Sequence, residues 1–288
     1  MHKPSKSNFF LTALFVIGPS IAIAAPPDWA KIPKREIQLF HPGVTPIEWV
    51  MKKSEHSGRT GLTKGETCVG CHEEKGGLNF DMKRLAGKEL EPKAAPTTVS
   101  FPVTVQAAYD KENLYLRMTF IPPSGGADHS DKENDVKATV LFANDKISVD
   151  AGGKSVAGAQ LGCWASCHGD ARTMPGSDDK KTKYTKSGAY ELMQWKSSKG
   201  AKAGDGFVAD KRTMDGGTSG VKAQGESKGG AVIVNFSRKL NGTLADGKAV
   251  PVGFAIHADK ASGRFHHVSL GYMLGIGIDG DIKAAKLQ

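Results

Sequence analysis

Residues 101–109 read Phe101-Pro102-Val103-Thr104-Val105-Gln106-Ala107-Ala108-Tyr109, and residues 114–120 read Leu114-Tyr115-Leu116-Arg117-Met118-Thr119-Phe120. In the first segment Val103, Val105 and Ala107 recur at every second position, which is the period of a β-strand. The second segment alternates in the same way, and the polar residues between the two segments predict a tight turn. The two segments therefore predict a β-hairpin and indicate a β protein.

Outward from this hairpin, the sequence predicts further strands at residues 136–142, 231–236, 252–257 and 266–273. No helical pattern alternates with these strands, so we expect an antiparallel sheet and a β-sandwich. The 35 glycines and the low aromatic content of 7% also favour a turn-rich β protein over a helical bundle. Residues 176–230 are rich in Gly, Lys, Ser and Asp, and we expect long loops there with Tyr190–Trp195 as an anchor.

All four cysteines of the chain lie in two short stretches that each end in a histidine. The first is Cys68-Val69-Gly70-Cys71-His72, a Cys-x-x-Cys-His motif, which is the signature of covalent c-type haem attachment. In such a motif both thiols bond to haem vinyl groups, and the His that follows binds the iron. The second is Gly162-Cys163-Trp164-Ala165-Ser166-Cys167-His168, which has one additional residue between its cysteines. If only one of its thiols bonds to haem, we expect Cys167, next to His168.

Three other uses of these cysteines compete with haem attachment. An exported protein can form disulfides, but a disulfide gives no reason for a His at both stretches. Two separated Cys-Cys-His sets contain enough ligands for zinc. A thioredoxin-like redox pair belongs at a strand-to-helix junction of a βαβ unit, which this sequence does not predict. We therefore expect two covalently attached haem c groups.

The N-terminus has the pattern of a secretory signal peptide. Lys3 and Lys6 precede the apolar run 9–23, and Ala22-Ile23-Ala24 is a small-x-small cleavage site. An uncleaved membrane anchor is the alternative, but the run is short for a membrane span and two prolines follow it. We expect residues 1–24 to be removed, which leaves an exported, periplasmic chain with no stable membrane insertion.

The charge of the chain excludes one class of partner. The formal net charge is +9, and it becomes 9 − 2 = +7 without the two lysines of the signal segment. Lysines are scattered and no helix interleaves basic with aromatic residues, so we do not expect a nucleic-acid partner. A mild basic bias suits docking to an acidic redox partner, or solubility alone. By these patterns we divide the mature chain into an N-terminal c-type haem module, irregular or helical, at residues 25–96 and a β-sandwich haem-binding domain at residues 97–288.

Each haem iron needs a sixth ligand unless that position stays open for chemistry. The pair His266-His267 differs from the single histidines, because neighbours on a strand point to opposite faces. One of the pair should face the sandwich interior, where a neutral imidazole needs a partner such as iron. The single histidines are His41, His56, His129 and His257. The alternative methionine ligands are Met118, Met174, Met193 and Met273, although a Met in a strand is more often part of the core.

Several of these segments resemble the haem-binding domain of the ethylbenzene dehydrogenase/dimethylsulfoxide reductase type. The resemblance is carried by Val105–Asp110, Leu114–Phe120, Gly162–Met174, Phe254–His257 and Arg264–Leu274. It covers the expected β-sandwich domain, and residues 40–95 resemble the additional c-type haem module of dihaem members. That family includes haem-binding gamma subunits of periplasmic molybdenum enzymes and related c-type cytochromes. The resemblance therefore implies a β-sandwich that holds one haem.

This chain departs from the gamma subunits, in which the haem is b-type and is held by Met and Lys. Cys163, Cys167 and His168 stand in the Met-ligand stretch, which implies a covalent haem with His168 as proximal ligand. The Lys-ligand stretch corresponds to the histidine pair. The resemblance thus implies that one of the pair is the distal ligand, with His266 favoured and His267 second.

For the first haem, the motif itself supplies His72 as the proximal ligand. We expect His56 as its distal ligand, because this residue lies shortly before the motif in a Gly-containing segment, and His257 is the rival. Bis-His ligation of both haems would favour a pure electron carrier, since no iron position would be open to substrate.

The sequence therefore predicts an exported dihaem c-type cytochrome that transfers electrons to or from a terminal oxidoreductase and is not itself an enzyme. Its expected partners are electron-donor and electron-acceptor proteins, with a molybdenum enzyme as one option. Three alternatives stay open. These are a haem enzyme with an open iron acting on a small redox substrate, a haem-binding subunit of a molybdenum-enzyme complex, and a disulfide-linked β-sandwich binding module without haem.

Overall fold

The computed structural model describes residues 26–43, 50, 54, 56–64, 66–74, 77–86, 96–143, 148–151, 154–157, 187–263 and 265–288. The second cysteine stretch, with Cys163, Cys167 and His168, lies outside the described residues, as does Met174. The helices are short: α2 (Arg59–Thr63), α3 (Cys68–His72) and α4 (Met82–Ala86). In the part of the chain that is described, no helix has the length and apolar character needed to cross a membrane.

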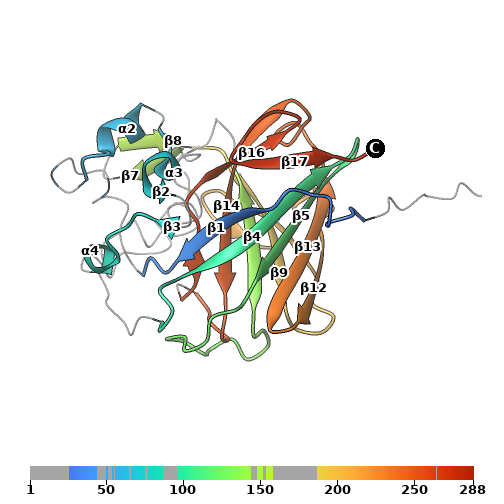
Figure 1. Ribbon diagram of the computed structural model, residues 1–288, viewed down its shortest axis with the longest axis horizontal. Helices are drawn as coiled ribbons and strands as arrows, with labels where there is room; N and C mark the ends of the chain where they lie inside the picture. The colour runs from blue at the N-terminus through green and yellow to red at the C-terminus, as the bar shows by residue number, and fades with distance from the viewer. Residues whose placement is uncertain are drawn as a thin grey trace, which may run out of the picture.

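The protein is mainly β, as predicted (Figure 1). The strands in chain order are β1 (Arg35–Phe40), β2 (Glu73–Glu74), β3 (Gly77–Leu78), β4 (Ser100–Tyr109), β5 (Asn113–Phe120), β6 (Lys137–Phe142), β7 (Ser148–Ala151), β8 (Lys154–Ala157), β9 (Tyr190–Lys196), β10 (Gly204–Val208), β11 (Arg212–Thr213), β12 (Lys222–Lys228), β13 (Ala231–Lys239), β14 (Lys248–His257), β15 (His267–Val268), β16 (Tyr272–Ile276) and β17 (Ile282–Lys286).

The predicted hairpin is present as β4 and β5, which pair antiparallel from Thr104–Thr119 to Tyr109–Leu114. The Asp110 carboxylate closes the turn by accepting the amide protons of residues 112 and 113, both at 2.7 Å. An aspartate at this position of a turn stabilises it in the same way in many proteins. The inward-facing positions of β4 are fully buried, which confirms the strand that the alternating pattern predicted.

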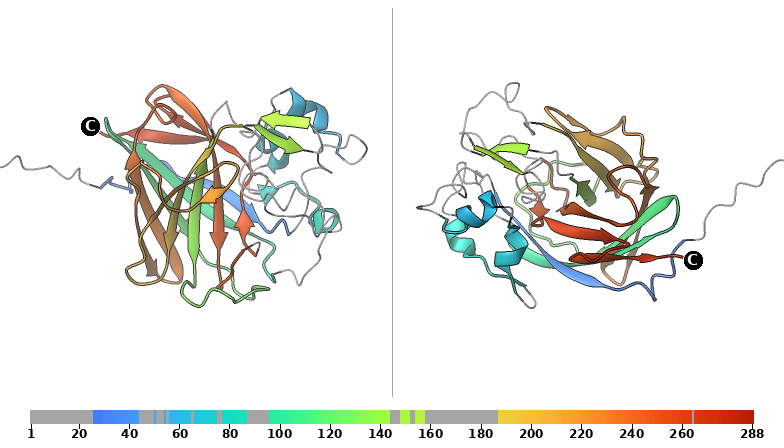
Figure 2. Two further views of the ribbon diagram at one scale, coloured as in Figure 1. Left: turned by 180° about the vertical axis from the view of Figure 1, so that it is seen from behind. Right: turned by 90° about the horizontal axis from the view of Figure 1, so that it is seen from above.

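Thirteen strands form one sheet in which the order is β11-β10-β9-β6-β14-β15-β1-β4-β5-β13-β12. β16 pairs with β14, and β17 links β16 to β4, so a ring of six strands closes at the centre of the sheet. The two wings of the sheet fold toward each other and enclose the core (Figure 2). Trp195 of β9 packs directly on β12, where a Cβ atom at Gly225 would lie 2.2 Å from the indole ring. This close approach joins the two wings.

The sheet is antiparallel except at β17, which runs parallel to both β16 and β4. The expectation of a purely antiparallel sheet was wrong at this strand. Residues 277–281 fold back on β16, and the backbones of Gly275 and Gly280 touch, with a Cβ at Gly280 only 2.6 Å from the Gly275 nitrogen. Because both positions are glycine, the chain reverses twice within a few residues, and β17 begins beside the middle of β16.

The expectation of long loops over residues 176–230 was wrong where the structure describes this segment. β9, β10, β11 and β12 all lie between residues 190 and 228, and residues 176–186 lie outside the described residues. β12 is an edge strand whose seven residues are almost all exposed. An edge strand is held by backbone pairing on one side and needs few apolar side chains, so the hydrophobic pattern did not indicate it.

The expected N-terminal module contributes to this same sheet. β1 pairs with β4 over its whole length and with β15 at Phe40. Before β1, Gln106 donates from its amide to the carbonyl oxygens of Trp29 and Ile32, both at 2.7 Å. The three helices gather beside the C-terminal end of β1, at one side of the sandwich (Figure 1, Figure 2).

A buried ion pair ties β13 to β9 across the core and generates a prediction. The Arg238 side chain is only 1% exposed; it donates to Glu191 and, at 2.7 Å, to the Ser219 hydroxyl. Glu191→Gln leaves this buried guanidinium without its counter-ion. Because Glu191 is itself partly exposed, we expect the free energy of unfolding to fall by about 2 kcal/mol, which is less than the cost of breaking a fully buried ion pair.

The measurement is urea unfolding of the mature protein. Glu133→Gln, at an exposed turn position, is the matched control and should change stability by less than about 0.5 kcal/mol. Equal urea midpoints for the two variants would show that the Arg238–Glu191 pair contributes nothing to stability.

Candidate functional site

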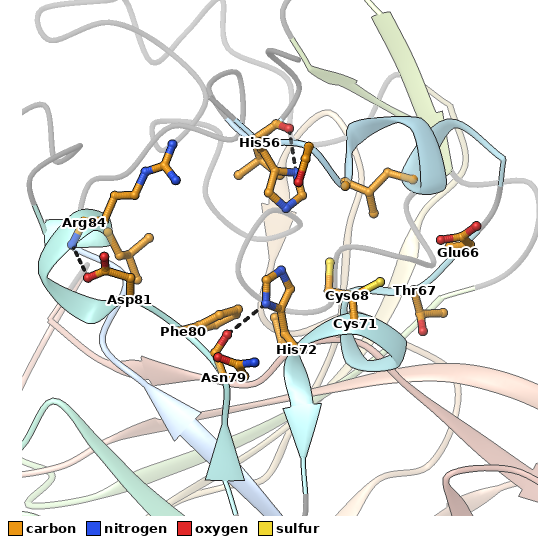
Figure 3. Close-up of a pocket in the computed structure, with 16 residues that line it drawn as sticks. His56, Glu66, Thr67, Cys68, Cys71, His72, Asn79, Phe80, Asp81 and Arg84 are labelled. Carbon is orange, nitrogen blue, oxygen red and sulfur yellow. Dashed lines mark hydrogen bonds between the residues drawn. The ribbon is translucent and has the colours of Figure 1, made fainter. Parts of the chain in front are cut away.

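The Cys-x-x-Cys-His motif forms the helical turn α3. Thr67 caps it, its hydroxyl oxygen accepting the amide proton of Gly70 at 3.2 Å. Positions i, i+3 and i+4 share one face of a helix. The thiols of Cys68 and Cys71 and the imidazole of His72 therefore point to one side, into a cavity (Figure 3). Cys68 is buried, whereas Cys71 is exposed.

The cavity beside α3 has a volume of about 410 Å³. Its walls are mostly apolar and come from both the helical segment and the sandwich, through Val50, Leu62, Phe80, Leu85 and Leu270. An apolar wall with a few convergent polar groups is the usual character of a cofactor site.

His56 faces His72 across this cavity (Figure 3). Their ring centroids are 5.9 Å apart and their planes differ by 24°. Two imidazoles that bind opposite sides of one metal have centroids about 6 Å apart, because a metal–imidazole bond is about 2 Å long. The separation of His56 and His72 therefore suits one metal ion between them.

Backbone carbonyl groups set the tautomer of both rings. His56 donates from Nδ1 to the Val50 oxygen at 3.1 Å, and His72 donates from Nδ1 to the Asn79 oxygen at 3.0 Å. A carbonyl can only accept, so Nδ1 carries the proton and Nε2 keeps its lone pair, which is the arrangement of metal-binding histidines. In both rings Nε2 is the atom that faces the cavity (Figure 3).

The electrostatics of the site favour neutral groups. Burial lowers the pKa of His56, outweighing its bond to Val50, and His72 and Arg84 act in the same direction as burial. Burial raises the pKa of the Cys68 thiol to about 12. A thioredoxin-like nucleophile requires a thiolate, which a thiol with this pKa does not supply near neutrality. The cavity thus fits covalent haem attachment better than a thioredoxin-like redox pair.

Two contacts that the sequence did not reveal join the motif to the sandwich. Phe80 packs edge-on against His72 at a centroid distance of 4.7 Å and against Phe40 of β1 at 5.1 Å. Glu73, next to His72, pairs with Arg35 of β1 and accepts a hydrogen bond from the Tyr272 hydroxyl at 3.0 Å. No local pattern signals these contacts, since their partners are distant in sequence.

The other histidines predicted as ligands, His257, His266 and His267, form a second histidine group, which does not line this cavity. His266 and His257 stack at a centroid distance of 4.4 Å with their planes at 16°, too close for a metal between the rings. His267 donates from Nε2 to the Thr98 oxygen at 2.7 Å, and burial lowers its pKa to about 4. Both members of the predicted pair are 5% exposed.

Three further candidate ligands are placed by the structure. His41 joins the second histidine group, with its Nδ1 3.2 Å from the His266 carbonyl oxygen. Met118 and Met193 are buried core residues of β5 and β9. His257 does not line the first cavity among the described residues, whereas His56 does.

The chain matches the family model described as ethylbenzene dehydrogenase over residues 26–230. It is 48% identical over 277 residues to cytochrome c-552 of Stutzerimonas stutzeri, and the alignment covers 91% of this chain and 92% of that protein. It is 45% identical over 262 residues to cytochrome c-551 of Rhodocyclus tenuis, and the alignment covers 90% of this chain and 99% of that protein. A solved structure of a family 9 carbohydrate-binding module from Caldicellulosiruptor kristjanssonii aligns with 62% of this chain and 69% of its own chain at 12% identity. The TM-score of 0.32 is too low to indicate a shared fold.

The position of Phe80 between His72 and Phe40 predicts that this ring anchors the helical segment on the sandwich. Phe80→Ala should lower stability by about 2 kcal/mol, less than the 3–5 kcal/mol of a fully buried phenylalanine because Phe80 is only partly buried. Urea unfolding of the holo-protein measures this loss. Phe207→Ala, at a ring that is 36% exposed in β10, is the matched control. Equal losses in the two variants would contradict an anchoring role for Phe80.

Proposed function

Because this chain belongs to the ethylbenzene dehydrogenase family and its similar relatives are cytochromes c, we propose that it is a c-type cytochrome that carries electrons. The observation that carries the proposal is the cavity in which two Nε2 atoms face each other beside the two thiols of a Cys-x-x-Cys-His motif. More specifically, we propose a periplasmic dihaem cytochrome that passes electrons between redox proteins.

At the first site, Cys68 and Cys71 would hold a haem covalently, and His72 and His56 would bind its iron. The bound haem supplies a one-electron couple, which the side chains alone do not. The protein residues hold the group, orient both imidazoles through carbonyl groups and keep water away with apolar walls. If both imidazoles bind the iron, no position would be left for substrate, and the potential would be lower than with a Met ligand.

At the second site, Cys163 and Cys167 attach a second haem with His168 as proximal ligand. His266 is the proposed distal ligand and His267 the second choice. The hydrogen bond of His267 Nε2 to Thr98 supports this order, because it occupies the nitrogen that haem ligation normally uses. Burial suits both residues equally, since a ligand to a haem in the sandwich must lie inside and each is 5% exposed.

We propose export to the periplasm, with residues 1–24 as the signal peptide, residues 25–96 as the first haem module and residues 97–288 as the sandwich domain. Donor and acceptor are separate redox proteins. The family match also favours a second candidate, a haem-binding subunit held on a larger oxidoreductase such as a molybdenum enzyme. Purification of the tagged protein from its native periplasm separates the two, because a subunit co-purifies with its enzyme in fixed ratio.

The first test of the proposed function is the intact mass of mature protein made in a host that attaches haem c. We expect a mass that exceeds that of the chain by two haems. The double variant Cys68→Ser/Cys71→Ser should lose one haem, and Cys163→Ser/Cys167→Ser should lose the other. A gain of one haem in the unaltered protein would reduce the proposal to a single-haem cytochrome, and no gain would reject it.

The second test concerns His56 as distal ligand. His56→Ala keeps both thioether bonds but opens one axial position, so we expect the reduced variant to bind carbon monoxide at one haem. The unaltered protein should not bind it. His129→Ala, at an exposed histidine outside the cavity, is the control and should keep the unaltered spectrum. A His56→Ala protein whose spectrum is also unchanged would exclude His56 as a ligand.

A further inference from the structure

The cavity between His56 and His72 has chemically different sides (Figure 3). The thiols of Cys68 and Cys71 lie on one side of the line joining the two imidazoles, and Arg84 lies on the other. Among the described residues that line the cavity, no other arginine or lysine occurs. The Arg84 guanidinium is close enough to His56 for the two groups to interact electrostatically.

Local structure holds Arg84 on this side of the cavity. α4 begins after Asp81, whose carboxylate caps the helix by accepting the Arg84 amide proton at 2.9 Å. Leu85 is buried and anchors the helix, so the exposed Arg84 side chain lies at the cavity mouth. Lys83, its neighbour in the helix, is also exposed but does not line the cavity.

The asymmetry of the cavity matches the asymmetry of haem. The vinyl groups that bond to cysteines lie on one half of the porphyrin, and the propionate carboxylates lie on the opposite half. A haem attached to Cys68 and Cys71 therefore directs its propionates toward the side of Arg84. The guanidinium offers paired donors that fit a carboxylate. Asp81 and Glu66 also line the cavity, but both are acidic and repel a propionate.

We propose that Arg84 binds a propionate of the haem at Cys68 and Cys71 and thereby raises the midpoint potential of that haem. This inference rests on the haem proposed above for this site. The sign follows from charge: iron(III) haem carries one more positive charge than iron(II) haem, so a nearby guanidinium disfavours the oxidised form. Binding also neutralises a carboxylate that would otherwise stabilise iron(III). Both effects raise the potential, and loss of Arg84 lowers it.

The test is spectroelectrochemical titration of the full holo-protein. In Arg84→Gln we expect one haem to shift to lower potential, while the intact mass and the low-spin spectrum stay unchanged. The resonance Raman bending band of the propionates should shift as well. Arg84→Lys keeps the charge and should lower the potential less than Arg84→Gln does. Lys83→Gln removes the same charge one residue earlier, outside the cavity, and is the matched control.

A potential shift in Arg84→Gln no larger than that in Lys83→Gln, with an unchanged propionate band, overturns the assignment. That result would leave the haem at Cys68 and Cys71 in place, because the intact mass reports it independently. Absence of that haem from the intact mass would instead reject the proposed function, and this inference with it. The two failures are therefore distinguishable in one set of variants.

Discussion

The contact of Phe80 with Phe40 connects the haem motif to the β-sandwich, and the shape of the cavity depends on it. α3 is a single helical turn and has too few hydrogen bonds to be stable alone. It is held because Phe80 packs between His72 and β1, and because Glu73 bonds to Arg35 and Tyr272. The sandwich thus acts as the rigid support on which a short, irregular segment builds a site.

Backbone carbonyl groups, rather than side chains, orient both imidazoles of the first site. This arrangement places the protonated nitrogen of each ring on the protein side and the lone pair on the cavity side. The same geometry separates the ligand-like pair from the histidines of the second group. His266 and His257 are stacked rings, and His267 directs Nε2 at a carbonyl oxygen. Ring separation and tautomer thus distinguish histidines whose ligand roles the sequence alone left open.

The strands predicted from alternating apolar residues were found, since burial of one face is what the alternation records. β4 and β5 are examples. The strands that were missed are of another kind. β12 and β10 are held mainly by backbone pairing, and β17 takes its parallel direction from a glycine-lined reversal. Backbone pairing leaves little trace in hydrophobicity, so the segment rich in Gly and Lys was interpreted as loops.

The sequence by itself determined the chemistry of the first site, because Cys68, Cys71 and His72 are close in the chain and one helical turn brings them to one face. It also determined the β character of the body, since alternation is a local property. Only the tertiary structure decided that His56 stands opposite His72, that Phe80 and Glu73 seat the motif on β1, and that Arg84 lies across from the thiols. These placements result from packing between distant segments, and no local residue pattern encodes them.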